Sequence, residues 1–132
     1  MRPSEATWSR SYRLPLPPHP IASRQAHRVL EWALRDWAVE AETADNARVV
    51  LSEMVTNALT HSLEVFRLAL GLHGDHILVE VWDGADGMPR VGLPDQLALN
   101  GRGMFLVDAL SKEWGVRPDP EGGKTIWAKV CH

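Results

Sequence analysis

Two runs of strictly alternating apolar residues, separated by a short turn, constrain the fold of this chain more than any other feature of its sequence. The alternating residues are Phe66, Leu68, Leu70 and Leu72, followed by Ile77, Val79 and Val81. A period of two places such side chains on one face of a strand. The intervening His73-Gly74-Asp75 is typical of a tight turn. We therefore predict an antiparallel hairpin with one buried face.

Two segments before this hairpin have the three- and four-residue spacing of amphipathic helices. The first spans Ile21 to Ala38, and the second spans about Thr43 to Ser62, with Thr43 as a candidate N-cap. Their apolar stripes are Ala22, Ala26, Val29, Leu30, Ala33 and Trp37, and then Val50, Leu51, Met54, Val55, Ala58 and Leu59. Each helix should bury one face.

The remaining segments complete a single domain. Residues 1–20 contain four closely spaced prolines and are predicted to be a loose N-terminal segment, with a first strand around Trp8 to Leu14 as one option. A Gly- and Pro-rich loop follows Asp83 and enters a helix over Met104 to Leu110.

Residues Trp114 to Arg117 and Thr125 to Cys131 should form a closing hairpin. This element order predicts an α+β fold, a two-layer α/β sandwich whose mostly antiparallel, mixed sheet has helices on one face, within residues 21–132.

Composition narrows the function classes. A chain of 132 residues that is 45% hydrophobic and 23% charged is expected to be one globular domain, and its formal charge of -3 argues against direct nucleic-acid binding. A single cysteine, Cys131, and the lack of an apolar leader predict a cytoplasmic protein. No run of about 20 apolar residues predicts a membrane span.

Glu53 and Asn57 are the first candidate site residues. At positions i and i+4 they project from the same side of the second helix, at the edge of its apolar stripe. An amide oxygen can ligate Mg²⁺, and a carboxylate can accept a proton from a nucleophile. Taken alone, the pair is more often an ordinary solvated helix flank.

Asp83 is the second candidate, because its parity with Ile77, Val79 and Val81 directs its carboxylate toward the buried face. Its hydrogen-bond donor could be an adenine amino group or a backbone N–H of the turn Gly84-Ala85-Asp86-Gly87. Gly101-Arg102-Gly103, just before a helix, suits phosphate. A bare Gly-x-Gly is weak evidence, and the alternative is a flexible loop hinge.

In this order the motifs resemble those of the GHKL ATPase superfamily, and within it the small bacterial histidine-kinase-like ATPases that act as anti-sigma factors and serine kinases. The segment from Leu51 to Ser62 resembles the N box of that superfamily, and Val81 to Gly87 resembles its first glycine box. Gly101 to Leu110 resembles the second glycine box, and the likeness extends over Ser11 to Val130.

The resemblance implies a Bergerat-type ATP-binding fold and a role for each matching residue. Asn57 would ligate Mg²⁺, Glu53 would be the general base, and Asp83 would bind adenine. The other implied nucleotide-binding residues are Gly87, Gly101, Arg102, Gly103 and Thr125. ATP and Mg²⁺ are the implied cofactors.

The implied partners are a sigma factor, an anti-sigma antagonist protein and, as an open option, a second copy in a homodimer. The leading hypothesis is a regulator of transcription that phosphorylates Ser or Thr of an antagonist protein. The alternative is a nucleotide-dependent binding module with little or no kinase activity.

Two features fit the resemblance less well. Ala85 stands where the glycine box usually has Gly or Ser, and the segment from Met88 to Asn100 is short for an ATP lid. Strand parity also places Thr125 with Trp127 on the outward side, unless the strand contains a bulge. Outward-facing Trp82 and Trp127 suggest an interface, unless the N-terminal segment covers them.

Overall fold

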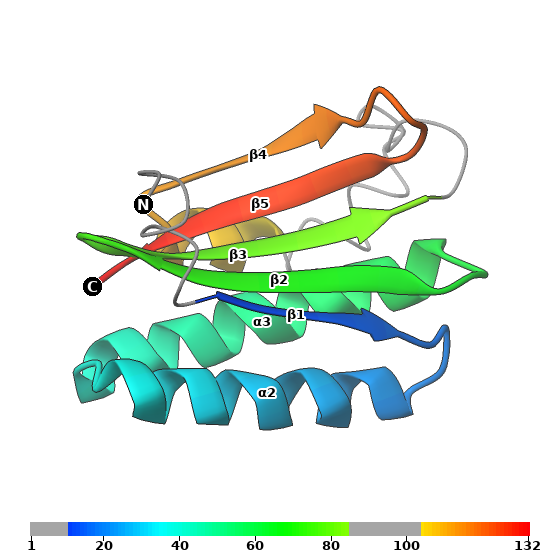
Figure 1. Cartoon of the computed structure of the whole chain (residues 1–132). Helices are drawn as coiled ribbons and strands as arrows, with labels where there is room; N and C mark the ends of the chain where they lie inside the picture. Colours follow the sequence, from blue (N-terminus) through cyan, green and yellow to red (C-terminus); the bar gives the residue numbers. More distant parts are fainter. Residues whose placement is uncertain (1–10, 85–103) are drawn as a thin grey trace, which may run out of the picture.

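One sheet with helices on a single face organises the chain (Figure 1). The structure is a computed structural model that describes residues 11–84 and 104–132. Its strands are β1 (Ser11–Leu16), β2 (Phe66–His73), β3 (His76–Asp83), β4 (Glu113–Pro118) and β5 (Lys124–Cys131). The strand order is β1-β2-β3-β5-β4, and every neighbouring pair is antiparallel.

Two long helices, α2 (Ile21–Trp37) and α3 (Ala41–His61), form the second layer, and residues 104–110 form a shorter helix. Helix α2 packs on β1 and β2, whereas α3 packs on β3 and β5. The predicted α+β sandwich with helices on one face is confirmed. The described sheet is wholly antiparallel, where a mixed sheet was expected.

The β2–β3 hairpin matches its prediction closely. Its register runs without interruption from Arg67 opposite Trp82 to His73 opposite His76, across a two-residue turn. Gly74 occupies the left-handed region with φ 57°, a conformation that glycine adopts at little cost. The apolar residues of both strands consequently face the helices.

The core forms where the alternating residues of the sheet meet the stripes of both helices. Its largest fully buried side chains include Phe66, Leu68, Leu70, Leu30, Leu51 and Met54. Three buried alanines on α2, Ala22, Ala26 and Ala33, leave little side-chain bulk between this helix and its neighbours. Among the described residues, no helix has the length and apolar character needed to cross a bilayer.

The link between α2 and α3 differs from its prediction. Helix α2 ends at Ala38, which adopts a left-handed conformation with φ 51° and donates its N–H to the Arg35 carbonyl. Helix α3 then begins at Ala41 after Glu40, which caps it without a side-chain hydrogen bond. The predicted N-cap, Thr43, is wrong, because this residue already lies inside the helix and is buried.

Polar contacts tie the outer parts of the two helices together. The Arg48 guanidinium donates two hydrogen bonds to Glu31, of 2.7 and 2.9 Å. His27 Nε2 and Ser52 Oγ lie 2.7 Å apart, within hydrogen-bonding distance. Ser52 directly precedes Glu53, so the second contact fixes the rotation of α3 next to a candidate site residue.

Replacing Ala38 by glycine should stabilise the protein. An L-residue in the left-handed region costs about 1–2 kcal/mol, and the greater freedom of unfolded glycine offsets about half of that gain. We expect a rise of about 0.5–1 kcal/mol in the free energy of unfolding, measured by urea denaturation. The control Ala41→Gly, in the first turn of α3, should destabilise instead. Destabilisation by Ala38→Gly would contradict the assigned helix end.

His27 should make stability depend on pH. Burial lowers the pKa of His27 below its ordinary value of 6.5, so the unfolded chain binds more protons than the folded chain between these two values. The free energy of unfolding should therefore fall as the pH drops from about 7.5 to about 5.5.

The variant His27→Gln, which can still bond Ser52, should show a smaller fall in denaturation experiments at several pH values. It should not abolish the effect, because burial also lowers the pKa of His73. An unchanged pH dependence would refute the assignment to His27.

Candidate functional site

Glu53 and Asn57 lie at the rim of the core on α3. Both are half-buried, and the residues that follow them, Met54 and Ala58, belong to the core. Neither the Glu53 nor the Asn57 side chain makes a hydrogen bond or ion pair with any residue that the structure describes. The polar atoms of these two side chains can therefore bind a ligand. They lie on the helix that packs on β3 and β5.

Asp83 faces the helices, as its parity predicts. It ends β3 and is only 3% exposed. Its partner across the strands is Lys124, the first residue of β5, whose Nζ lies 3.8 Å from Asp83 Oδ2. A buried carboxylate needs a donor or a cation nearby, and Lys124 is one that the sequence reasoning missed. The sequence does indicate that Lys124 faces the helices, because it alternates in step with Ile126, Ala128 and Val130.

The glycine turn between β4 and β5 lies against the end of β3. Gly123 has φ 80°, and a Cβ at this position would collide with the Asp83 carbonyl oxygen and with Cα of Gly84. The turn is closed by the Asp119 N–H, which donates to the Gly123 carbonyl over 3.0 Å. Close backbone contact therefore fixes Asp83 beside Lys124. Glycine is required here for both its conformation and its lack of a side chain.

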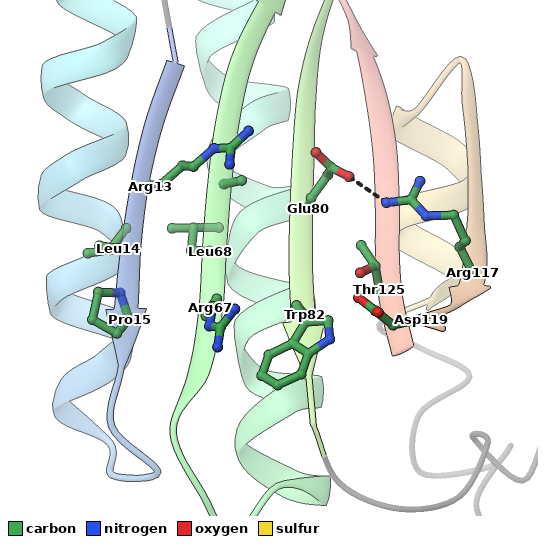
Figure 2. Close-up of a pocket in the computed structure, with 11 residues that line it drawn as sticks. Arg13, Leu14, Pro15, Arg67, Leu68, Glu80, Trp82, Arg117, Asp119 and Thr125 are labelled. Carbon is green, nitrogen blue, oxygen red and sulfur yellow. Dashed lines mark hydrogen bonds and ion pairs between the residues drawn. The ribbon is translucent and has the colours of Figure 1, made fainter. Parts of the chain in front are cut away.

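Thr125 lies on the other face of the sheet. It pairs with Trp82 in a β3–β5 register that continues without a bulge from Asp83 to His76. Figure 2 shows both side chains on the open face, in a pocket of about 570 Å³. Thr125 and Asp83 therefore do not converge. The alternative of a strand bulge, which would have turned Thr125 toward the helices, does not occur.

The lining of this open-face pocket includes Trp82, three arginines and two acids, which are Arg13, Arg67, Arg117, Glu80 and Asp119 (Figure 2). The Arg67 guanidinium lies 4.4 Å from the centre of the Trp82 ring, a cation–π contact, and Arg117 pairs with Glu80 at 3.1 Å. Trp82 and Trp127 are each half-buried. Complete burial of both tryptophans within the monomer would have contradicted the hypothesis that this face is an interface. Because both are partly exposed, the interface stays a prediction.

The predicted residues Gly87, Gly101, Arg102 and Gly103 lie outside the described residues. The helix predicted after them is present at residues 104–110, and its Val107 is completely buried in the core. The Trp114 indole N–H also donates to Asp108 over 2.8 Å and joins this helix to β4. Glu53, Asn57 and Asp83 are thus the described part of the predicted site.

Comparison with known proteins identifies the family. A model of the histidine kinase-like ATPase domain matches residues 16–130, and the chain therefore belongs to the histidine kinase-like ATPase family. Membership implies an ATP-binding domain. It agrees with the GHKL resemblance of the N box and glycine-box motifs. No curated protein matches the sequence.

Solved structures share the fold. One is the structure of the RsbU and RsbW domains of Rv1364c from Mycobacterium tuberculosis, with 18% identity and a TM-score of 0.69. That match covers 92% of this chain and only 31% of the mycobacterial chain. A second is the SiaB-SiaC complex from Pseudomonas aeruginosa, with 13% identity, a TM-score of 0.65 and coverage of 98% of this chain and 96% of that chain. At these identities the matches establish the fold alone.

The two faces of the sheet should respond differently to mutation. Asp83→Asn replaces a charged acceptor on the helix side, and we expect it to weaken ATP binding at least about tenfold. Thr125→Val, of similar shape on the open face, should change the affinity by no more than about twofold. Isothermal titration calorimetry measures both, with thermal unfolding as a check of folding. A large loss for Thr125→Val would place the nucleotide on the open face.

Proposed function

We propose that this chain binds Mg-ATP between α3 and the sheet and acts as a regulatory protein kinase of the anti-sigma type. One observation carries the proposal: Glu53 and Asn57 lie half-buried on the helix that packs against β3 and β5, with no described partner. Asp83 faces the same layer from the end of β3. Family membership supports the nucleotide, and the roles of individual residues are our proposal.

In this arrangement Asp83 and Asn57 would bind different parts of Mg-ATP. The Asp83 carboxylate is suited to accept a hydrogen bond from the amino group of adenine. Asn57 offers an amide oxygen to Mg²⁺, which takes few protein ligands and completes its octahedral shell with phosphate oxygens and water. The ion would supply positive charge that stabilises the phosphates. We also assign Gly87, Gly101, Arg102 and Gly103 to nucleotide binding, whereas Thr125 is assigned to the open face.

Glu53 is suited to act as the base in phosphoryl transfer. Its carboxylate would take the proton of a serine or threonine hydroxyl as that oxygen bonds to the γ-phosphorus. The bond to the bridging oxygen breaks, and ADP leaves with the electron pair. Glu53 lies one helical turn from Asn57 on the same side of α3, so a base at Glu53 would be near an ion held by Asn57.

The proposed acceptor is an antagonist protein, and the proposed regulated partner is a sigma factor, through which the chain would control transcription in the cytoplasm. A second candidate is a nucleotide-dependent binding module without transfer. It is favoured by the same observation, because the pair on α3 can hold Mg-ATP whether or not Glu53 removes a proton. A homodimer is compatible with both.

Substitutions on α3 separate binding from transfer. Asn57→Ala should weaken Mg-ATP binding about tenfold by removing an ion ligand. Glu53→Gln should leave binding within about twofold and reduce transfer by about 10²–10⁴-fold. Calorimetry measures binding, and labelled ATP measures transfer to a partner that is retained in the presence of Mg-ATP.

Matched controls lie on the same helix. Asn46→Ala and Glu42→Gln, nearer the start of α3, should affect neither quantity. Wild-type transfer by Glu53→Gln would remove the base role. Retention of a partner with ATP, without any transfer by the wild type, would instead support the binding module.

A further inference from the structure

The pair formed by Asp83 and Lys124 is unusual among the ion pairs of the described residues. Its side chains are only 7% exposed for Lys124 and 5% exposed for Asp83. In each of the other pairs at least one side chain is more than a third exposed. Burying a charge is costly unless nearby groups compensate it. A lysine retained at this depth therefore calls for a specific partner.

The contact with Asp83 does not fully supply that partner. The distance of 3.8 Å from Lys124 Nζ to Asp83 Oδ2 exceeds the length of a hydrogen bond between an ammonium and a carboxylate. The ammonium donates no hydrogen bond to any residue that the structure describes. An ammonium has three N–H donors and no acceptor. Lys124 can therefore donate to a ligand without giving up a hydrogen bond to a described residue.

The backbone holds this donor beside the proposed base-binding carboxylate. Asp83 and Lys124 are directly opposite across β3 and β5, on the helix-facing side of the sheet. The contact of Gly123 with Asp83 and Gly84 restrains the strand ends further. A charged acceptor and a charged donor thus sit side by side in fixed order. Such a pair matches a ligand edge on which a donor and an acceptor are neighbours.

We infer that Lys124 is a second base-reading residue, which donates to the ring nitrogen N1 of adenine while Asp83 accepts from the neighbouring amino group. This inference rests on the proposed nucleotide-binding function. It names a specificity determinant for that site. Adenine presents its amino donor and its N1 acceptor next to each other, in the order that the Asp83–Lys124 pair requires.

Guanine would be rejected twice in the same orientation. Its O6 oxygen, an acceptor, would face the Asp83 carboxylate, and its N1–H, a donor, would face the Lys124 ammonium. Buried polar groups left without partners produce strong discrimination between ligands of the same size. Lys124 should therefore strengthen the preference for ATP over GTP, beyond what Asp83 achieves alone.

The experiment compares ATP with 1-deaza-ATP, in which the N1 nitrogen is replaced by C–H, in the wild type and in Lys124→Met. Wild type should bind 1-deaza-ATP about tenfold to a hundredfold more weakly than ATP, because a hydrogen bond from a charged donor is lost. Lys124→Met, of similar length but without a donor, should bind the two nearly equally. It should also bind ATP more weakly than wild type does.

A control ligand and a control variant sharpen this comparison. In 7-deaza-ATP the change lies away from the N1 edge, so wild type and Lys124→Met should lose the same factor, if any. Thr125→Val, next in sequence but on the opposite face, should keep the wild-type discrimination against 1-deaza-ATP. Measurement by calorimetry with Mg²⁺ present gives all affinities.

Two results would overturn the inference and leave the proposed nucleotide site intact, and a third would refute both. Equal binding of ATP and 1-deaza-ATP by wild type would show that N1 is not read. The same discrimination in wild type and in Lys124→Met would assign N1 to another residue. Binding of ATP in either case leaves the nucleotide site intact. No binding of ATP by the wild type would refute the site and this inference together. Should Lys124→Met not fold, equal binding of ATP and 1-deaza-ATP by the wild type would still overturn the inference.

Discussion

The packing of one sheet face against α2 and α3 is the constraint on which the other features of this protein depend. A sheet of alternating large aliphatic residues must exclude water from one side, and burial of each such side chain contributes about 1.5–3 kcal/mol. Phe66, Leu68 and Leu70 supply much of that surface from β2 alone. Once this face is covered, the orientation of every other strand residue is determined, including those that carry charge.

That constraint places the functional side chains of β3 and β5 on two opposite faces of the sheet. At the end of β3 and the beginning of β5, successive residues belong to opposite faces. Asp83 and Lys124 enter the covered face, where a low dielectric strengthens their interactions with each other and with any ligand. Trp82 and Thr125 lie on the open face, where they line a pocket together with charged side chains of both signs. The two surfaces are thus separated only by the thickness of one sheet.

Much of the fold could be predicted from the sequence, because the apolar residues recur at the regular spacings of strands and helices. The hairpin, both helices and the inward direction of Asp83 follow from spacings of two or of three to four residues. The start of α3 at Ala41 could not be predicted, since it depends on the left-handed conformation of Ala38. Alanine rarely adopts that conformation, so the sequence gives no indication of it. Motif resemblance grouped Thr125 with Asp83, whereas strand parity placed them apart, and the register follows the parity.

Lys124 shows why resemblance to a motif is weaker than geometry at such a position. The sequence Gly122-Gly123-Lys124-Thr125 is superficially similar to a phosphate-binding loop, but such a loop leads into a helix, whereas Lys124 begins strand β5. The Lys124 side chain matters because it lies on the helix-facing side of the sheet. Burying an ammonium among core-facing residues costs free energy unless a carboxylate and a ligand offset that cost. The backbone contact at Gly123 restrains the Asp83–Lys124 geometry without using either side chain. The order of donor and acceptor is therefore set by the strands, and a ligand edge with the complementary order is the one that this end of the sheet can bind best.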